Sequence, residues 1–146
     1  MARAVQRLVA LGTVVACAPT VLGCAGHRSS TDGRDAVLRV TEKDFKITAA
    51  AVVGAGDVRL VVTNHGPDDH ELAVVRAPIV GTLPLRRDGV TVDEAATEQI
   101  RLGDVEPEPS GTVSELRLHL KPGRYLLLCN MSGHYLGGMH TTVVAR

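Results

Sequence analysis

A thiol, an imidazole and a thioether lie within eleven residues near the end of this 146-residue chain, at Cys129, His134 and Met139. Sulfur donors combined with imidazole select copper among the biological first-row metals. Two histidines and one cysteine in a trigonal arrangement, with a long bond to an axial methionine, form one of the ligand sets that hold a single copper ion. The segment therefore predicts a copper-binding loop that still lacks one histidine.

The missing histidine has to come from a distant part of the chain. Residues 64–69 form a dense turn signal that contains His65, and His70 follows directly before β character resumes at Glu71. Either imidazole could reach a metal from this turn. The strand that resumes at Glu71 favours His70, which leaves His65 as a solvated turn residue.

The sulfur donor also has an alternative. Met131 lies only two residues after Cys129 and cannot easily reach an axial position, whereas Met139 lies at the far end of the loop. Met139 could instead be a packing residue, because it opens a predicted strand. Three glycines allow the loop to fold back so that its donors converge, at Gly133, Gly137 and Gly138.

The first residues predict an export signal. Arg3 and Arg7 precede an uncharged apolar run over residues 8–18, which is shorter than the ~20 residues that a membrane-spanning helix needs. Small and aliphatic residues then lead to Cys24, as in the lipobox of bacterial lipoproteins, where the cysteine is acylated. Cys17 has a similar context but lies too close to Arg7 to leave a full apolar run. The alternative is a plain secretory signal.

The chain is thus divided into a lipoprotein signal peptide at 1–23, a flexible tether at 24–35 that begins with the lipidated Cys24, and one domain at 36–146. The protein is expected outside the cytoplasm, attached to the cell membrane by lipid, or secreted in the alternative. Cys129 is then the only thiol of the mature domain. A single thiol in an oxidising compartment has no disulfide partner within the chain, which favours its use as a ligand.

The domain has the sequence pattern of an all-β protein. Short β runs separated by turns cover residues 37–40, 45–47, 57–63, 71–75, 116–120, 125–129 and 139–144. This pattern predicts an antiparallel β-sandwich of seven or eight strands. Aromatic residues make up only 2% of the chain, so its core must be aliphatic. Residues 78–97 interrupt the rhythm as a long insertion, with a short helix expected near 92–96.

Two motifs resemble those of the cupredoxin family. The run from Gly123 to Cys129, followed by Cys-x4-His-x4-Met, is similar to the ligand loop of the rusticyanin-like, auracyanin-like and sulfocyanin-like members. Asn64-x-Gly66-x3-His70 resembles the stretch before the first ligand in plastocyanin-like chains. Tyr125 lies four residues before Cys129, as a tyrosine does in that group. The resemblance covers residues 36–146, and the insertion at 78–97 departs from it.

The resemblance implies a Greek-key sandwich with one type 1 (blue) copper ion. His70, Cys129 and His134 would be the strong ligands and Met139 the axial one. The neighbours Asn64, Glu71 and Asn130 would support the site, and hydrogen bonds from Glu71 and Asn130 would tie the two ligand segments together. The expected function is one-electron transfer between transient redox partners. Copper delivery or copper resistance is the alternative.

Charge and motif content argue against other functions. Lys and Arg balance Asp and Glu at 16 each, and loss of residues 1–23 leaves 14 basic and 16 acidic residues. A net charge near −2 gives no electrostatic basis for binding nucleic acid. Catalytic triads, phosphate loops and CxxC motifs are missing from the sequence, and one cupredoxin-like domain is too little for a multicopper oxidase. We therefore expect a monomeric carrier and not an enzyme.

Overall fold

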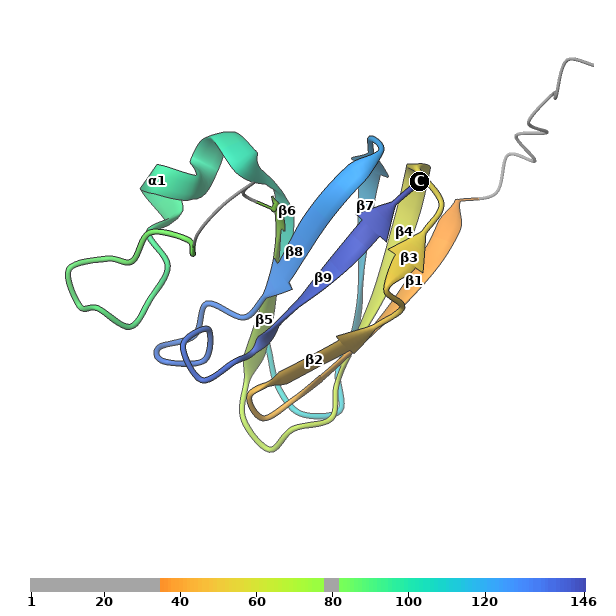
Figure 1. Ribbon diagram of the computed structural model, residues 1–146. Coiled ribbons are helices and arrows are strands. Elements are labelled where there is room, and N and C mark those ends of the chain that lie inside the picture. The colour runs from red at the N-terminus through yellow and green to blue at the C-terminus, as the bar shows by residue number, and fades with distance from the viewer. Residues whose placement is uncertain (1–34, 78–81) are drawn as a thin grey trace, which may run out of the picture. The chain divides into compact units, whose positions relative to one another are not determined.

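The computed structural model describes residues 35–77 and 82–146, which form two β-sheets packed face to face (Figure 1). The first sheet has the order β2-β1-β4-β7, made from Lys46–Ala49, Ala36–Lys43, Gly56–Asn64 and Val113–Leu120. The second has the order β3-β9-β8-β5-β6, made from Val52–Val53, His140–Ala145, Gly123–Leu128, His70–Arg76 and Arg101–Glu108.

Three parts of the expected organisation fall outside these ranges. The predicted signal peptide at 1–23, the lipidated Cys24 and nearly all of the tether at 24–35 lie outside the described residues. Over residues 35–77 and 82–146, no helix has the length and apolar character needed to cross a membrane.

The predicted all-β sandwich is confirmed, and each of the seven predicted β runs corresponds to a strand. The expectation of purely antiparallel sheets is wrong, because β1 pairs with β4 and β3 pairs with β9 in parallel. Two strands were not predicted. β3 has only two residues, and β6 carries Gly103, Pro107 and four charged residues without any period-2 pattern. Both strands form because a neighbouring strand supplies their hydrogen bonds.

The core between the sheets is aliphatic, as the composition required. Alternate residues of several strands point inward, for example Leu38 and Val40 of β1 and Leu127 of β8. Full burial of one such side chain contributes about 1.5–3 kcal/mol of transfer free energy. Tyr125 is the one aromatic residue of this cluster, and its hydroxyl donates to the Lys121 carbonyl oxygen at 2.7 Å. Tyr125 is therefore a packing residue of the core with a satisfied hydroxyl group.

The insertion covers the outer face of the second sheet. It contains helix α1 (Glu94–Thr97), slightly later than predicted, and the 3-10 helix η1 (Glu98–Ile100) follows it directly. Leu83 and Val92 of the insertion form a second apolar cluster with Ala73, Val75 and other residues of that outer face. Strands buried on both faces read as continuous apolar runs, which explains the unbroken leucines of β8.

Glu42 is an exception to the apolar interior. It occupies the third inward position of β1, after Leu38 and Val40, and only 2% of its surface is exposed. Its Oε1 atom has no hydrogen-bond partner. Burial, aided by the nearby Glu71 carboxylate, raises the pKa of Glu42 from its ordinary 4.5 to about 8. The folded chain therefore carries Glu42 as a neutral acid at pH 7.

We expect Glu42→Gln to flatten the dependence of stability on pH. The folded pKa of Glu42 lies above the unfolded value, so its contribution is fully present below pH 4.5 and is lost as pH rises toward 8. As pH rises from 4.5 to 8, the free energy of unfolding of the wild type should therefore fall relative to that of Glu42→Gln. The slope of this fall should be up to about 1.4 kcal/mol per pH unit. Urea unfolding between pH 4.5 and 8 measures this, with the exposed Glu98→Gln as control. Parallel profiles for wild type and Glu42→Gln would contradict a neutral Glu42.

Candidate metal centre

Two imidazoles and one thiol converge at one end of the sandwich. His70 begins β5, Cys129 directly follows β8, and His134 lies in the loop between β8 and β9. One donor atom from each of the three side chains lies within 4.8 Å of the other two. The Cys129 sulfur is 3.4 Å from Nδ1 of His134, and the rings of His70 and His134 meet edge to face at 5.2 Å between centroids. His70 and Cys129 are fully buried, whereas His134 is half-buried.

Met139 lies against both ligands of its loop. Its carbonyl oxygen accepts the Cys129 N–H at 3.1 Å, and its own N–H donates to the His134 carbonyl at 2.9 Å. The Met139 side chain is fully buried in the main core cluster together with Cys129. Met131 is only partly buried against that cluster, and His65 is exposed in the turn before β5.

Short turns wind the loop around these residues. The His134 N–H donates to the Met131 carbonyl at 2.9 Å, and the Gly137 N–H donates to the Gly133 carbonyl at the same distance. Gly133 and Gly138 have φ angles of 80° and 98°, in the region that favours glycine. Their backbone freedom allows the chain to return toward the sandwich at Met139.

Burial disfavours the charged forms of Cys129 and His70. It raises the pKa of the Cys129 thiol to about 11, although the N–H groups of Glu71 and Met131 hydrogen-bond to the sulfur and partly oppose this. Burial, and next the nearby His134, lower the pKa of His70. Both ring nitrogens of His70 are buried without a hydrogen-bond partner. A cation would satisfy the orphaned imidazole and stabilise the thiolate.

The chemistry of the donors fits one type 1 copper ion. A thiolate and two imidazoles are the three strong donors of such a site, and a thioether sulfur is available in the same loop. The donors come from the first residue of β5, the residue directly after β8 and the loop that follows, so the fold itself places them close together. Among the described residues, this is the one group of three or more such side chains close enough to share an ion.

Asn64 supports the turn that carries His70. Its amide nitrogen donates to the carbonyl oxygens of Asp68 at 2.8 Å and Glu108 at 2.9 Å. Its Oδ1 atom accepts the Gly66 N–H at 2.8 Å. These three bonds fix both ends of the β4–β5 turn, so Asn64 determines where β5, and hence His70, begins.

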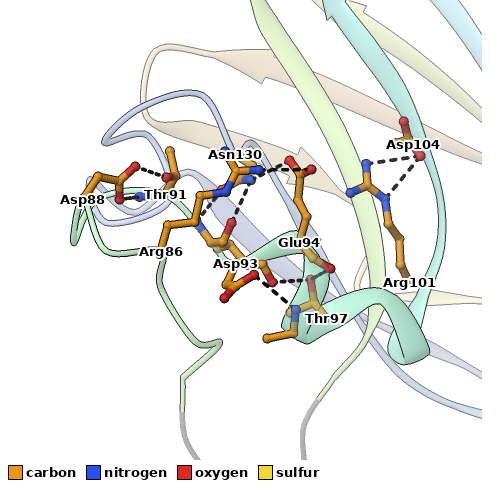
Figure 2. A network of polar contacts seen from close by, with 11 residues as sticks. Arg86, Asp88, Thr91, Asp93, Glu94, Thr97, Arg101, Asp104 and Asn130 are labelled. Carbon is orange, nitrogen blue, oxygen red and sulfur yellow. Dashed lines mark hydrogen bonds and ion pairs between the residues drawn. The ribbon is translucent and has the colours of Figure 1, made fainter.

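Glu71 and Asn130 join the two ligand segments through the backbone. Burial raises the pKa of the Glu71 carboxyl, and the Asn130 backbone N–H partly opposes this rise, just as the Glu71 backbone N–H partly opposes the rise in the pKa of Cys129. The Asn130 side chain has a different partner from the one the sequence suggested. Its Oδ1 atom accepts the Val92 N–H at 2.6 Å, and its Nδ2 atom donates to the Val92 carbonyl and to Glu94 Oε1, both at 3.2 Å (Figure 2).

The insertion therefore holds the ligand loop at several points. Besides the Asn130 contacts, the Gly133 N–H donates to the Val90 carbonyl at 3.3 Å, and the Leu83 N–H donates to the Tyr135 hydroxyl at 3.4 Å. Figure 2 shows the Glu94 carboxylate facing both Asn130 and Arg86, and Glu94 forms an ion pair with Arg86 at 3.2 Å. Residues 82–97 of the insertion, for which the sequence indicated no role at the site, therefore flank the loop that supplies Cys129 and His134.

Two residues beside the histidines were not predicted from the sequence. Asp44 and Phe45 form the turn between β1 and β2, and they approach His70 and His134 respectively. One feature of the sequence could have pointed to these residues. Two-residue turns usually contain glycine or asparagine, and the turn at Asp44 and Phe45 contains neither.

Comparison with known proteins identifies the fold. No protein-family model matches the chain, and no curated protein sequence matches it either. Solved structures do match. Dithionite-reduced auracyanin from Roseiflexus castenholzii superimposes with a TM-score of 0.57 at 14% identity, over 75% of this chain and 96% of that one. Auracyanin A, a "blue" copper protein from Chloroflexus aurantiacus, gives 0.56 at 14% identity over 75% and 98%.

Reduced rusticyanin matches with a TM-score of 0.52 at 14% identity, over 75% of this chain and 79% of that one. At these identities the likeness shows the fold. The chain has the cupredoxin fold, as the sequence resemblance predicted, and its His70, Cys129 and His134 cluster fits a blue-copper site.

We predict that Asn130→Ala releases the insertion from the ligand loop. The change leaves the buried Val92 N–H and carbonyl without partners, which costs about 1–3 kcal/mol. Urea unfolding should show this loss, and amide hydrogen exchange should accelerate at Val92 before it does in β8. The matched control is Ser132→Ala, an exposed position of the same loop. Equal stability and equal exchange in the two variants would show that the insertion does not depend on Asn130.

Proposed function

We propose that this protein binds one copper ion through His70, Cys129 and His134, with Met139 as axial ligand, and that it carries single electrons. The observation that supports this most directly is the meeting of two imidazoles and one buried thiol within 4.8 Å. Copper in such a site changes between Cu(I) and Cu(II). The fold agrees with this function, and the matched auracyanin A is a "blue" copper protein.

The residues of the chain would limit rearrangement when an electron moves. Met139 is tied through its backbone to both Cys129 and His134, and the Asn130 side chain ties the residue after Cys129 to the insertion. Ligands held by the fold cannot follow the geometric preference of either oxidation state. A site of this kind needs little reorganisation, which favours fast electron transfer.

His134 is the proposed route for electrons. It is the one half-buried member of the three ligands. The exposed Leu136 lies two residues after it, and the exposed Phe45 contacts its ring. This small apolar surface suits the brief encounters of a carrier with its redox partners. We propose a monomer whose donor and acceptor bind here in turn.

Copper delivery is the second candidate function, and enzymatic activity is the third. A delivery protein needs an accessible site, whereas His70 and Cys129 are fully buried and the whole chain has only three methionines. Within the described residues, the His70, Cys129 and His134 group offers one metal site, while multicopper oxidases use several. Both observations favour a carrier that retains its copper.

We also propose that the carrier works outside the cytoplasm, tethered to the membrane by lipid on Cys24. The support is the apolar run followed by small and aliphatic residues before that cysteine.

A Cu(II) absorption spectrum tests the metal site. The wild type should show an intense visible band from charge transfer between Cys129 and copper, and Cys129→Ser should lose it. Met139→Leu should keep the band but shift the reduction potential upward, because loss of an axial donor disfavours Cu(II). His65→Ala serves as control, because His65 is exposed in the turn before His70. A colourless wild type, or a band that survives Cys129→Ser, would reject the proposal.

Metabolic labelling with a radioactive fatty acid tests the tether. The wild type should incorporate label and partition with membranes, whereas Cys24→Ser should do neither and Cys17→Ser should behave as the wild type. If Cys17→Ser loses the label and Cys24→Ser keeps it, the lipid is attached to Cys17 and our proposal for Cys24 is wrong.

A further inference from the structure

The turn between β1 and β2 has an unusual backbone. Lys43 and Lys46 pair across the two strands, so Asp44 and Phe45 alone make the turn. Phe45 has a φ angle of 56°, and it is the one non-glycine residue with positive φ among the residues that the structure describes. A bulky side chain in this conformation costs about 1–2 kcal/mol relative to glycine. Other contacts must hold the turn in this shape.

Phe45 is held against the metal-binding loop. Its ring centroid lies 5.1 Å from that of His134, with the ring planes tilted by 58°. Gly137 leaves space for the ring, because a Cβ atom at that position would collide with the Phe45 side chain. Even so, 49% of Phe45 remains exposed, so the ring covers His134 without entering the core.

Asp44 is held against the other histidine. Its Oδ1 atom lies 3.7 Å from Nε2 of His70. Gly66 leaves space here, because a Cβ atom at Gly66 would lie 2.6 Å from Asp44 Oδ1 and 2.7 Å from His70 Nε2. The two side chains of one turn thus approach the two histidines, and each fits where a glycine has no side chain.

The position of Asp44 bears on which nitrogen of His70 binds metal. Nε2 points toward Asp44, which leaves Nδ1 as the ligand atom. A metal-bound histidine almost always donates its other N–H to a carboxylate, a carbonyl or water, and Nε2 is buried without such an acceptor. At 3.7 Å, Asp44 is at ion-pair distance, and a small movement of this surface turn would bring it within hydrogen-bonding range.

We infer that the Asp44–Phe45 turn is a positioning element of the metal site. Asp44 accepts the Nε2–H of His70 and so presents Nδ1 to the ion, and Phe45 packs on the His134 ring and slows release of the ion. This inference rests on the proposed copper function. It accounts together for the strained φ angle, the two glycines and the two unpartnered ring nitrogens of His70, of which Nδ1 would face the ion and Nε2 would face Asp44.

Asp44→Asn and Asp68→Asn form a matched pair for the first role. Each removes one negative charge near His70, and only Asp44 contacts the ring. In the full-length protein, Asp44→Asn should weaken Cu(II) binding by about 10- to 100-fold, and Asp68→Asn by much less. Competition with a chelator measures this. Equal losses in both variants would mean that Asp44 acts only through its charge, and would overturn the inference.

A metal-free measurement separates this inference from the proposed function. Long-range proton–nitrogen correlation spectra of the copper-free protein report the tautomer of His70. We expect a proton on Nε2 in the wild type and a mixture of tautomers in Asp44→Asn. A proton on Nδ1 in the wild type would overturn the role of Asp44. If the expected tautomer is found but the copper-loaded protein shows no blue band, the proposed electron carrier is rejected and the contact between Asp44 and His70 stands.

The rate of copper loss tests Phe45. Transfer of Cu(I) to a chelator in excess should be several-fold faster in Phe45→Ala than in Phe45→Leu, which keeps an apolar side chain over His134. Val52→Ala, at another exposed apolar position, should lose copper at the wild-type rate. Equal rates of copper loss in the wild type, Phe45→Ala and Phe45→Leu would show that Phe45 does not slow release of the ion.

Discussion

The register between β5 and β8 is the constraint on which the metal centre depends. Ala73 of β5 lies opposite Leu128 of β8, and the pair faces the insertion, so that the flanking Leu72 and Cys129 face the core. A slip of one residue would turn every side chain of β8 to the other face and move the thiol away from His70. The contacts of Glu71 with Cys129 and Asn130 lie across the same pair of segments and hold this register at the site.

The insertion makes that register more secure from the other side of the sheet. Its apolar residues cover the outer face of β5 and β8, and its backbone is bound by the Asn130 side chain directly after Cys129. The sheet that supplies two of the donors is therefore buried on both faces. Such packing suits a site that must keep its shape while its charge changes. Part of the polar network of Figure 2 lies in the same insertion, where Asp88 caps the turn before Val92 and Asp93 caps the start of helix α1.

Much of this structure was predictable from the sequence, because its signals were local. Period-2 alternation located β7, apolar runs located β4 and β8, and the spacing of Cys129, His134 and Met139 indicated a ligand loop. β3 and β6 could not be predicted, because they are strands only through their partners. Likewise, the position of Asp44 and Phe45 beside the histidines depends on how the β1–β2 turn packs, and no spacing in the sequence encodes a contact of that kind.

Phe45 illustrates how evolution of this fold is restricted. The backbone at this position favours glycine, so a change of Phe45 to glycine would relieve the backbone strain but remove the ring. Gly137, in turn, is free of backbone strain but cannot gain even a methyl group while the ring is present. Changes at the two positions are therefore coupled. In an alignment of descendants of this chain, we would look for paired exchange, with a side chain at 137 where position 45 has become small.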